Sequence, residues 1–341
     1  MCRLLGVVTR EPMPLVAAVP RELPLFTALS EKHRAGWGVA WYVAEGDAAG
    51  ESTAGDDEAD DVLVVDRQAA GVEAAAVADG EAHVDDLSDE AVAAFEEAPY
   101  ARESGTDGLR VRLGTDTALA SNEYGDALAE AWSDLAIVHL RTVPPVAPPS
   151  LVNTHPFIEG GVAFAHNGVM DRPDGLTEAI VARGGRPPVG DTDSELLFSL
   201  IELHAREVGW AGAIQIAAVE LTDILTSLGA RIPRALNCLV ITPDALHTYA
   251  QSDPAQMPDA ATWDTYDLML LAEDDRVVVS SSGYEWDAFD ALEEGTVATV
   301  SRETLEVTIL PPLEQFVLAP SRVAGRGAWI AERRARGIDA R

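Results

Sequence analysis

The chain has 341 residues, of which 47% are hydrophobic, and this content excludes a disordered protein. Its formal net charge of −33 comes from 57 acidic residues against 24 basic ones. Such a surface disfavours nucleic acid and anionic membranes, because phosphate groups are bound by clustered Lys and Arg. No uninterrupted apolar run approaches the roughly 18 residues of a membrane-spanning helix, so we expect a soluble globular protein.

The charge also indicates the solvent to which the protein is adapted. Lys32 is the only lysine, so the remaining basic residues are arginines. Self-repulsion of this size is destabilising at ordinary ionic strength, whereas molar salt shortens the screening length to about 3 Å. We therefore expect a halophilic protein, and the alternative is an acidic protein from an ordinary host.

The two cysteines, Cys2 and Cys238, do not make a disulfide framework. No CxxC or HExxH spacing is present, so we expect no metal and no cofactor. The apolar stretch at the N-terminus is too short for a signal peptide. These features favour a reducing compartment, and we expect a cytoplasmic protein.

The first predicted elements are β-rich apolar strands at 4–9 and 36–43, separated by a helix at about 22–33. Between Glu45 and Asp107 there are 20 acidic residues and only two arginines. This composition predicts a solvated acidic insertion, which we place at about 45–131.

The pattern then tightens into short apolar strands, helices and further strands. The predicted strands lie at 135–140, 162–166, 235–242, 246–251, 277–281 and 296–300, and the predicted helices at 175–183, 194–207 and 211–228. A hairpin across Pro243 and Asp244 joins two of the strands. This order predicts an α+β sandwich. We expect one domain over 2–315, followed by a C-terminal tail at 316–341.

Cys2 is a candidate nucleophile because of its position. Removal of Met1 would leave one residue with both a thiol and a free α-amine. An α-amine has a pKa of about 7.7 to 8 and a thiol one of about 8.5, so the amine can take the thiol proton near neutrality. A cysteine at this position can also be accidental, and the position alone does not decide.

A second group of polar residues lies further along the chain. It comprises His139, Arg141, Asn153, His155, His166, Asn167, Gly168, Asp191, Asp193 and Glu195. Taken singly, an Arg at a strand end is usually a surface ion pair, Asn-Gly a turn and Asp before Ser a helix cap. Taken together, they supply a cation for a carboxylate, donors for an oxyanion and a carboxylate for an ammonium. That set suits an α-amino acid with a reactive amide at its far end.

These motifs resemble class II glutamine amidotransferases. They are the initial Met-Cys-Arg-Leu-Leu-Gly, Gly-Trp-Gly at 36–38, His-x-Arg, Asn-x-His-Pro, His-Asn-Gly and Asp-Thr-Asp-Ser-Glu, in that order. The chain is most similar to small stand-alone members, a group that includes γ-glutamyl hydrolases of thiol-histidine biosynthesis. The resemblance covers residues 2–43 and about 135–310.

The resemblance implies a four-layer αββα sandwich of the N-terminal-nucleophile hydrolase type. It also implies that Cys2 attacks the amide carbon and forms a thioester. Asn167 and the Gly168 N–H would then be the oxyanion hole. Arg141 would hold the substrate α-carboxylate and Asp193 its α-ammonium. His155 would shape the loop over the site. The substrate is then glutamine or a γ-glutamyl compound, and the product is ammonia or an amine.

Several alternatives stay open at this stage. Many relatives carry Thr or Ser three residues after the motif Arg, where this chain has Pro144. We expect the final strand to end near Leu310, and only about 30 residues follow it, so we expect no synthase domain in the chain. A separate synthase subunit would then receive ammonia, or γ-glutamyl hydrolysis would itself be the productive step. The other readings are a catalytically silent binding or scaffold protein and a zinc triad of His139, His155 and His166, with zinc the weakest.

Overall fold

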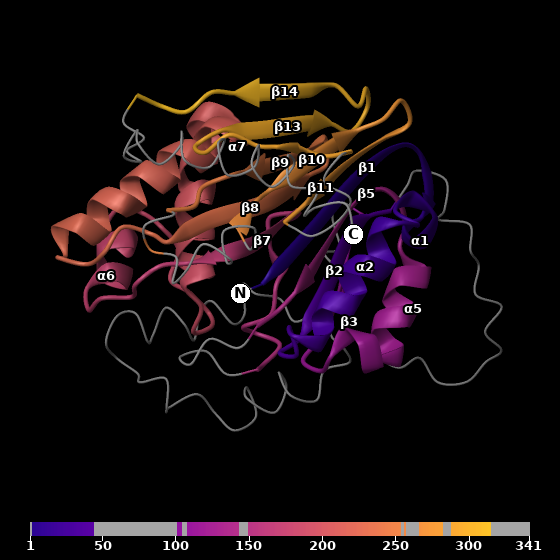
Figure 1. Cartoon of the computed structure of the whole chain (residues 1–341). Helices are drawn as coiled ribbons and strands as arrows, with labels where there is room; N and C mark the ends of the chain where they lie inside the picture. Colours follow the sequence, from indigo (N-terminus) through magenta and orange to yellow (C-terminus); the bar gives the residue numbers. More distant parts are fainter. Residues whose placement is uncertain are drawn as a thin grey trace, which may run out of the picture.

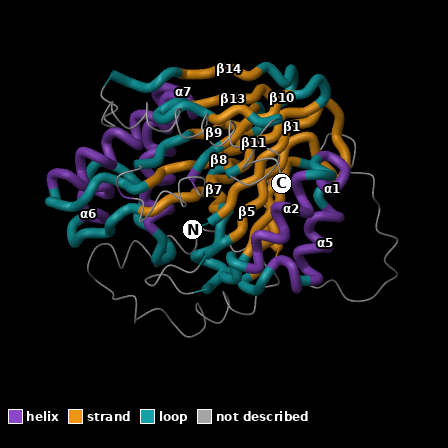
Figure 2. Tube along the Cα trace, in the orientation of Figure 1, coloured by secondary structure: helices purple, strands orange, loops and turns teal. Residues whose placement is uncertain are grey.

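The computed structural model describes residues 2–43, 101–103, 108–142, 149–253, 256, 266–281 and 288–314. Two antiparallel sheets lie face to face in this part of the chain, with helices on both outer faces (Figures 1 and 2). This is the predicted αββα sandwich. The predicted tail, the loop with Pro144 and most of the acidic insertion lie outside the described residues.

Sheet A contains the N-terminal strand near its centre. Its order is β12 (Asp290–Ala291), β10 (Met269–Ala272), β11 (Arg276–Ser280), β1 (Arg3–Pro14), β5 (Trp132–Leu140), β2 (Trp37–Tyr42), β4 (Leu109–Gly114) and β3 (Ala101–Glu103). β1 pairs with β5 and β11, so both of its edges are hydrogen-bonded. The first residues of the chain are thereby fixed between two neighbours.

Sheet B is built from later parts of the chain. Its order is β14 (Val307–Leu310), β13 (Val297–Ser301), β9 (Ala245–Tyr249), β8 (Ala235–Thr242), β7 (Val162–Val169) and β6 (Phe157–Glu159). β8 and β9 form the predicted hairpin, with Thr242 opposite Ala245.

The helices divide between the two outer faces. Sheet A is covered by α1 (Leu15–Ala18), α2 (Glu22–Ala28) and α5 (Asn122–Glu130), and sheet B by α6 (Leu176–Val181) and α7 (Asp193–Ser227) (Figure 1). Leu4 and Leu239 belong to the core between the sheets, whereas Leu5 belongs to the core under α1 and α2. Because side chains alternate along a strand, each strand contributes to both of its neighbouring layers.

The predicted insertion extends too far at its C-terminal end. Residues 109–130 form β4 and α5 with the short helix η3 (Ala118–Ala120), and β4 pairs with β2 inside sheet A. Leu109 and Val111 are buried in the core between the sheets, and Tyr124 of α5 is buried in the core between that helix and sheet A. The acidic composition ends at Asp107, and the alternating burial of β4 begins directly after it.

α7 is long and apolar enough, by length and composition, to cross a membrane. Its apolar residues pack on sheet B, as those of a core helix do, with Phe198 and Leu221 fully buried. Gly209 is non-helical at φ 74°, ψ 166° and divides α7 into two segments. They match the two helices predicted at 194–207 and 211–228.

Candidate active site

Cys2 and Arg141 lie next to each other at the ends of two paired strands of sheet A. Arg3 of β1 is opposite Leu140 of β5, so the same register places Cys2 opposite Arg141. Leu4 faces the core between the sheets and so, two residues earlier, does Cys2. The Cys2 side chain lies close enough to Arg141 for its charge to act on the guanidinium. The predicted nucleophile and cation are therefore neighbours.

Arg141 is not a surface ion-pair residue. It is 2% exposed, and its backbone continues the β5–β2 pairing, with its N–H donating to Gly36 O at 2.8 Å and its carbonyl accepting from Ala35 N at 3.1 Å. Burial lowers the Arg141 pKa, and the charge of Cys2 opposes that shift. A buried guanidinium at this position is suited to an anionic ligand.

Asn167 reaches the same space from the opposite sheet. It is fully buried in β7 and shares a strand face with Ala163 and Ala165, which line the core between the sheets. Asn237 of β8 is directly opposite. The Asn237 amide donates to Tyr266 O and accepts from Gln251 N at 2.8 Å, so it is fixed on both sides. Asn167 therefore stands beside a rigid polar neighbour.

Gly168 is inside β7 and not in a turn. A Cβ at this position would collide with the Ala235 carbonyl and with His166 Nε2, so only glycine fits. Opposite it, Leu236 directs its N–H to Gln251 O on the β9 side. Because the N–H and C=O of a strand residue share one edge, the Gly168–Leu236 pair is non-hydrogen-bonded. The Gly168 N–H consequently points away from β8, as a donor for a ligand must.

Asp193 begins α7 beside the end of β7. Its Oδ2 accepts from Met170 N at 3.0 Å, and Thr192 occupies the cap position without a capping side-chain bond. His166, which is hydrogen-bonded through Nδ1 to Ser194 Oγ at 2.9 Å, feels the Asp193 charge. The carboxylate thus lies at the β7 terminus, against the backbone of Met170.

The loop before α7 is held by residues to which the sequence assigned no role. Asn153 Nδ2 donates to Asp191 Oδ2 at 3.2 Å, and Asn153 Oδ1 accepts from Asp191 N at 2.7 Å. Glu195 Oε2 accepts from Gly190 N at 2.6 Å. Asn153 belongs to the Asn-x-His-Pro motif, and this motif is the sequence feature that could have predicted its role.

His155 is buried beneath the site. Its ring centroid lies 4.4 Å from those of His139 and Phe157, and neither ring nitrogen has a hydrogen-bond partner among the described residues. Burial lowers its pKa well below the usual value, with the charge of His139 adding to the effect. The His155 carbonyl lies so close to Gly38 that a Cβ there would collide with it. This packing accounts for the second glycine of Gly-Trp-Gly.

The three histidines of the zinc alternative do not form a metal site. His139 and His166 are also buried, and burial is the main cause that lowers the pKa of each. Across the described ranges, no three His, Cys, Asp or Glu side chains are grouped to hold a metal ion. Cys238 is buried in β8, and burial raises the pKa of its thiol. A thiol that stays protonated is a poor nucleophile.

Comparison with known proteins places this geometry in a family. The family model of glutamine amidotransferases class-II matches residues 107–281, a little over half of the chain. No curated protein matches. A glutamine aminotransferase class-II domain protein from Silicibacter pomeroyi is 15% identical, with a TM-score of 0.53 over 91% of this chain and 99% of that one. The structure of the allosteric regulatory enzyme of purine biosynthesis is 15% identical, with a TM-score of 0.51 over 90% of this chain and 48% of that one.

The chain therefore belongs to the class II glutamine amidotransferases. The structural similarities, at 15% identity, bear on the fold alone, and they agree with the two-sheet architecture. The family implies hydrolysis of the glutamine amide.

Proposed function

We propose that the protein hydrolyses the side-chain amide of glutamine or of a γ-glutamyl compound through a thioester at Cys2. The observation that supports the proposal is that Cys2 and Arg141 are neighbours in sheet A. Asn167 belongs to the strand face of sheet B that lines the space between the sheets, so the sandwich offers donors from both sheets.

In this proposal the α-amino acid end of the substrate binds first. Arg141 pairs with the α-carboxylate through its planar fork, and Asp193 pairs with the α-ammonium. The buried position of Arg141 makes the carboxylate contact strong, because little water screens it. Both contacts fix the side-chain amide against Cys2.

The chemistry then follows in two stages. After removal of Met1, the Cys2 α-amine takes the thiol proton, and the sulfur attacks the amide carbon. The Asn167 amide and the Gly168 N–H stabilise the oxyanion. The protonated amine gives its proton to the departing nitrogen as the C–N bond breaks, which leaves a γ-glutamyl thioester. Water then attacks the thioester carbon and restores the thiol, releasing glutamate.

The fate of the nitrogen product has two versions. Either a separate synthase subunit receives ammonia, or a γ-glutamyl amide is the substrate and the released amine is the useful product. A cytoplasmic, halophilic setting belongs to the same proposal and is supported by the charge of −33. A catalytically silent binding protein is the competing function.

The binding half of the proposal is tested with Arg141→Met and Arg141→Lys. We expect the kcat/KM for glutamine to fall about a hundredfold in both, because lysine lacks the bidentate fork. The matched substrate is 4-aminobutanamide, which has no α-carboxylate, and its slow turnover should change little between wild type and variants. An equal fall for both amides would contradict the carboxylate contact.

A further inference from the structure

Arg234 and Tyr266 lie on the opposite side of Cys2 from Arg141. In sheet A, β5 with Arg141 borders β1 on one side, while β11 and β10 follow on the other. Tyr266 lies three residues before β10, and Leu268 between them lies in the core between the sheets. In sheet B, Arg234 directly precedes β8, on the side of β7 away from β6. The charge of Cys2 acts on the Tyr266 phenol, and Arg234 lies beside that phenol, so both residues are near the nucleophile.

Tyr266 is tied to the proposed oxyanion hole. Its side chain is buried, and its carbonyl accepts from the amide of Asn237, the cross-strand neighbour of Asn167. Burial raises the Tyr266 pKa to about 12, the charge of Arg234 opposes this rise, and the charge of Cys2 also acts on the phenol. Tyr266 is thus a neutral hydroxyl close to the nucleophile.

Arg234 forms no salt bridge among the described residues, although its charge acts on Asp171, the partner of Arg231. Its backbone is fixed, with its N–H donating to Val169 O at 2.9 Å and its carbonyl accepting from Asp253 N at 2.7 Å. Its Nε is buried and has no hydrogen-bond partner in the part of the chain that the structure describes. The guanidinium lies beside the Tyr266 hydroxyl, and this contact opposes the rise in the pKa of the phenol.

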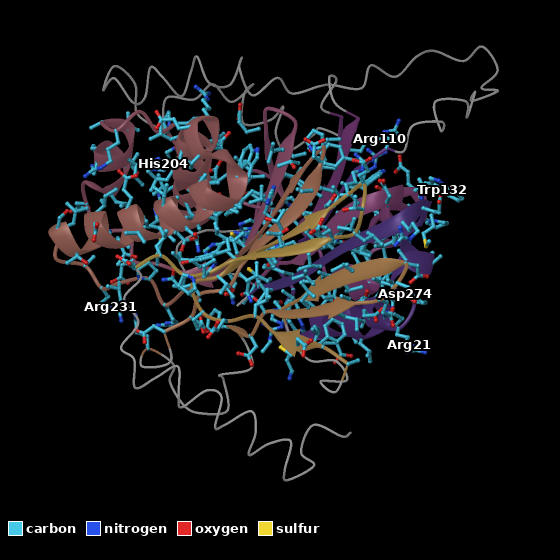
Figure 3. All side chains as sticks on the ribbon, turned by 90° about the horizontal axis from the view of Figure 1, so that it is seen from above. Arg21, Arg110, Trp132, His204, Arg231 and Asp274 are labelled. Atoms are coloured by element: carbon cyan, nitrogen blue, oxygen red, sulfur yellow. The ribbon has the colours of Figure 1, made fainter. Side chains whose placement is uncertain are left out.

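Arg231 lies three residues before Arg234 and, unlike it, forms an ion pair. It pairs with Asp171 at 2.8 Å and is 67% exposed, at the outer edge of the molecule in Figure 3. Among the described residues Arg234 has no such close pair, and a partly buried guanidinium without one carries a desolvation cost, which a bound anion would offset.

We propose that Arg234 and Tyr266 bind a carboxylate on the amine side of a γ-glutamyl amide. This inference rests on the proposed function, in which Arg141 and Asp193 hold the glutamyl end of the substrate. With that end on the β5 side of Cys2, the substituent on the amide nitrogen extends towards β11 and β10. A guanidinium and a phenolic hydroxyl there supply the donors that a carboxylate accepts. The substrate class is then a γ-glutamyl amino acid or peptide.

The test compares γ-glutamylglycine with γ-glutamylglycinamide, which differ only in a carboxylate against a neutral amide. We expect wild type to favour γ-glutamylglycine by about tenfold or more in kcat/KM, the effect of a charge-assisted hydrogen bond. Arg234→Met should bring that ratio close to one, and Tyr266→Phe should lower it severalfold. Arg231→Met is the matched control and should retain the wild-type ratio. Each ratio is taken within one preparation, so a reduced folded fraction cancels.

The experiment distinguishes failure of this inference from failure of the proposed function. If glutamine and both amides are hydrolysed but wild type shows no preference, or Arg234→Met keeps the preference, the inference is overturned and the proposed function stands. If none of the three is hydrolysed by the mature protein, the proposed function is overturned, and the inference with it.

Discussion

The Asn153 side chain forms two hydrogen bonds with Asp191. Nδ2 donates to the Asp191 carboxylate, and Oδ1 accepts from the Asp191 backbone N–H. This pair joins the loop before β6 to the loop before α7. Asp193 lies two residues beyond Asp191, so the pair sets where its carboxylate stands. Asn153 is therefore a positioning residue for the proposed ammonium contact.

Replacement of Asn153 by alanine should loosen the start of α7. We expect the KM for glutamine to rise severalfold with a smaller change in kcat, because Asp193 binds substrate and does no chemistry. The free energy of unfolding should fall by about 1–2 kcal/mol for the lost hydrogen bonds. Steady-state kinetics and urea unfolding measure the two effects.

Thr226→Ala is the control for Asn153→Ala. Its hydroxyl donates to Thr222 O at 2.8 Å near the exposed end of the same helix. It should alter stability slightly and leave KM unchanged. A Thr226 variant that raised KM as much as Asn153→Ala would show that general softening of α7, and not the Asp191 contact, affects binding.

Gly168→Ala should inactivate the enzyme more than it unfolds it. The new methyl group would meet the Ala235 carbonyl and the His166 ring, so β7 must shift. Displacing one oxyanion donor costs roughly 10²–10³ in kcat, and overpacking costs about 1–3 kcal/mol of stability. Near-normal kcat in a folded Gly168→Ala protein would contradict the donor assignment.

Gly125→Ala is the control, and we expect it to change stability in the opposite direction. Gly125 is exposed within α5, and a Cβ there would meet nothing within 4 Å. Alanine should stabilise the protein by roughly 0.5–1 kcal/mol, because it is the better helix former. Activity should stay at the wild-type value.

The buried histidines predict a pH-dependent stability. Burial lowers the pKa of His139, His155 and His166, and that of His247 to about 4. Below about pH 6.5 the unfolded chain binds protons that the folded chain does not, so stability falls as pH decreases. Each histidine contributes up to about 1.4 kcal/mol per pH unit. Chemical unfolding at pH 7.5, 6.5 and 5.5 measures the slope.

His155→Gln should reduce that slope by about one proton, because it removes one titrating group. The same slope in the variant and in wild type would contradict a neutral His155 in the folded state. Comparing slopes, and not absolute stabilities, separates this effect from the packing lost beside Phe157.

Salt should stabilise the folded protein. The 57 acidic residues repel one another, and screening weakens that repulsion. We expect the thermal midpoint to rise between 0.1 M and 2 M KCl, and activity to rise with it. A midpoint that falls or stays level over this range would favour an ordinary acidic protein.

The layered fold was predictable because its strands are short apolar runs with clear boundaries. β8 and β9 were found from apolar residues around Pro243 and Asp244, and α7 was predicted as two helices at 194–207 and 211–228. β4 and α5 were missed because they follow an acidic stretch directly. Their burial depends on β2 and on α1, which lie far away in the sequence.

The site was predictable only in part. Motifs marked Cys2, Arg141, Asn167 and Asp193, but no pattern marked Asn237 as their neighbour, since it is one polar residue in an apolar strand. Arg234 and Tyr266 belong to no motif, and their proposed place at the site depends on the strands that follow them in the two sheets. Contacts of this kind arise from strand register and sheet order, which one sequence does not reveal.

The most direct test of the account is a mass map of the N-terminal peptide during turnover. Mature protein mixed with excess glutamine and quenched in acid should lack Met1 and carry one γ-glutamyl group on Cys2. The Cys2→Ala variant should fold, carry no adduct and hydrolyse nothing. Retained Met1 in active protein, an adduct on another residue, or undiminished hydrolysis by Cys2→Ala would contradict the central claim.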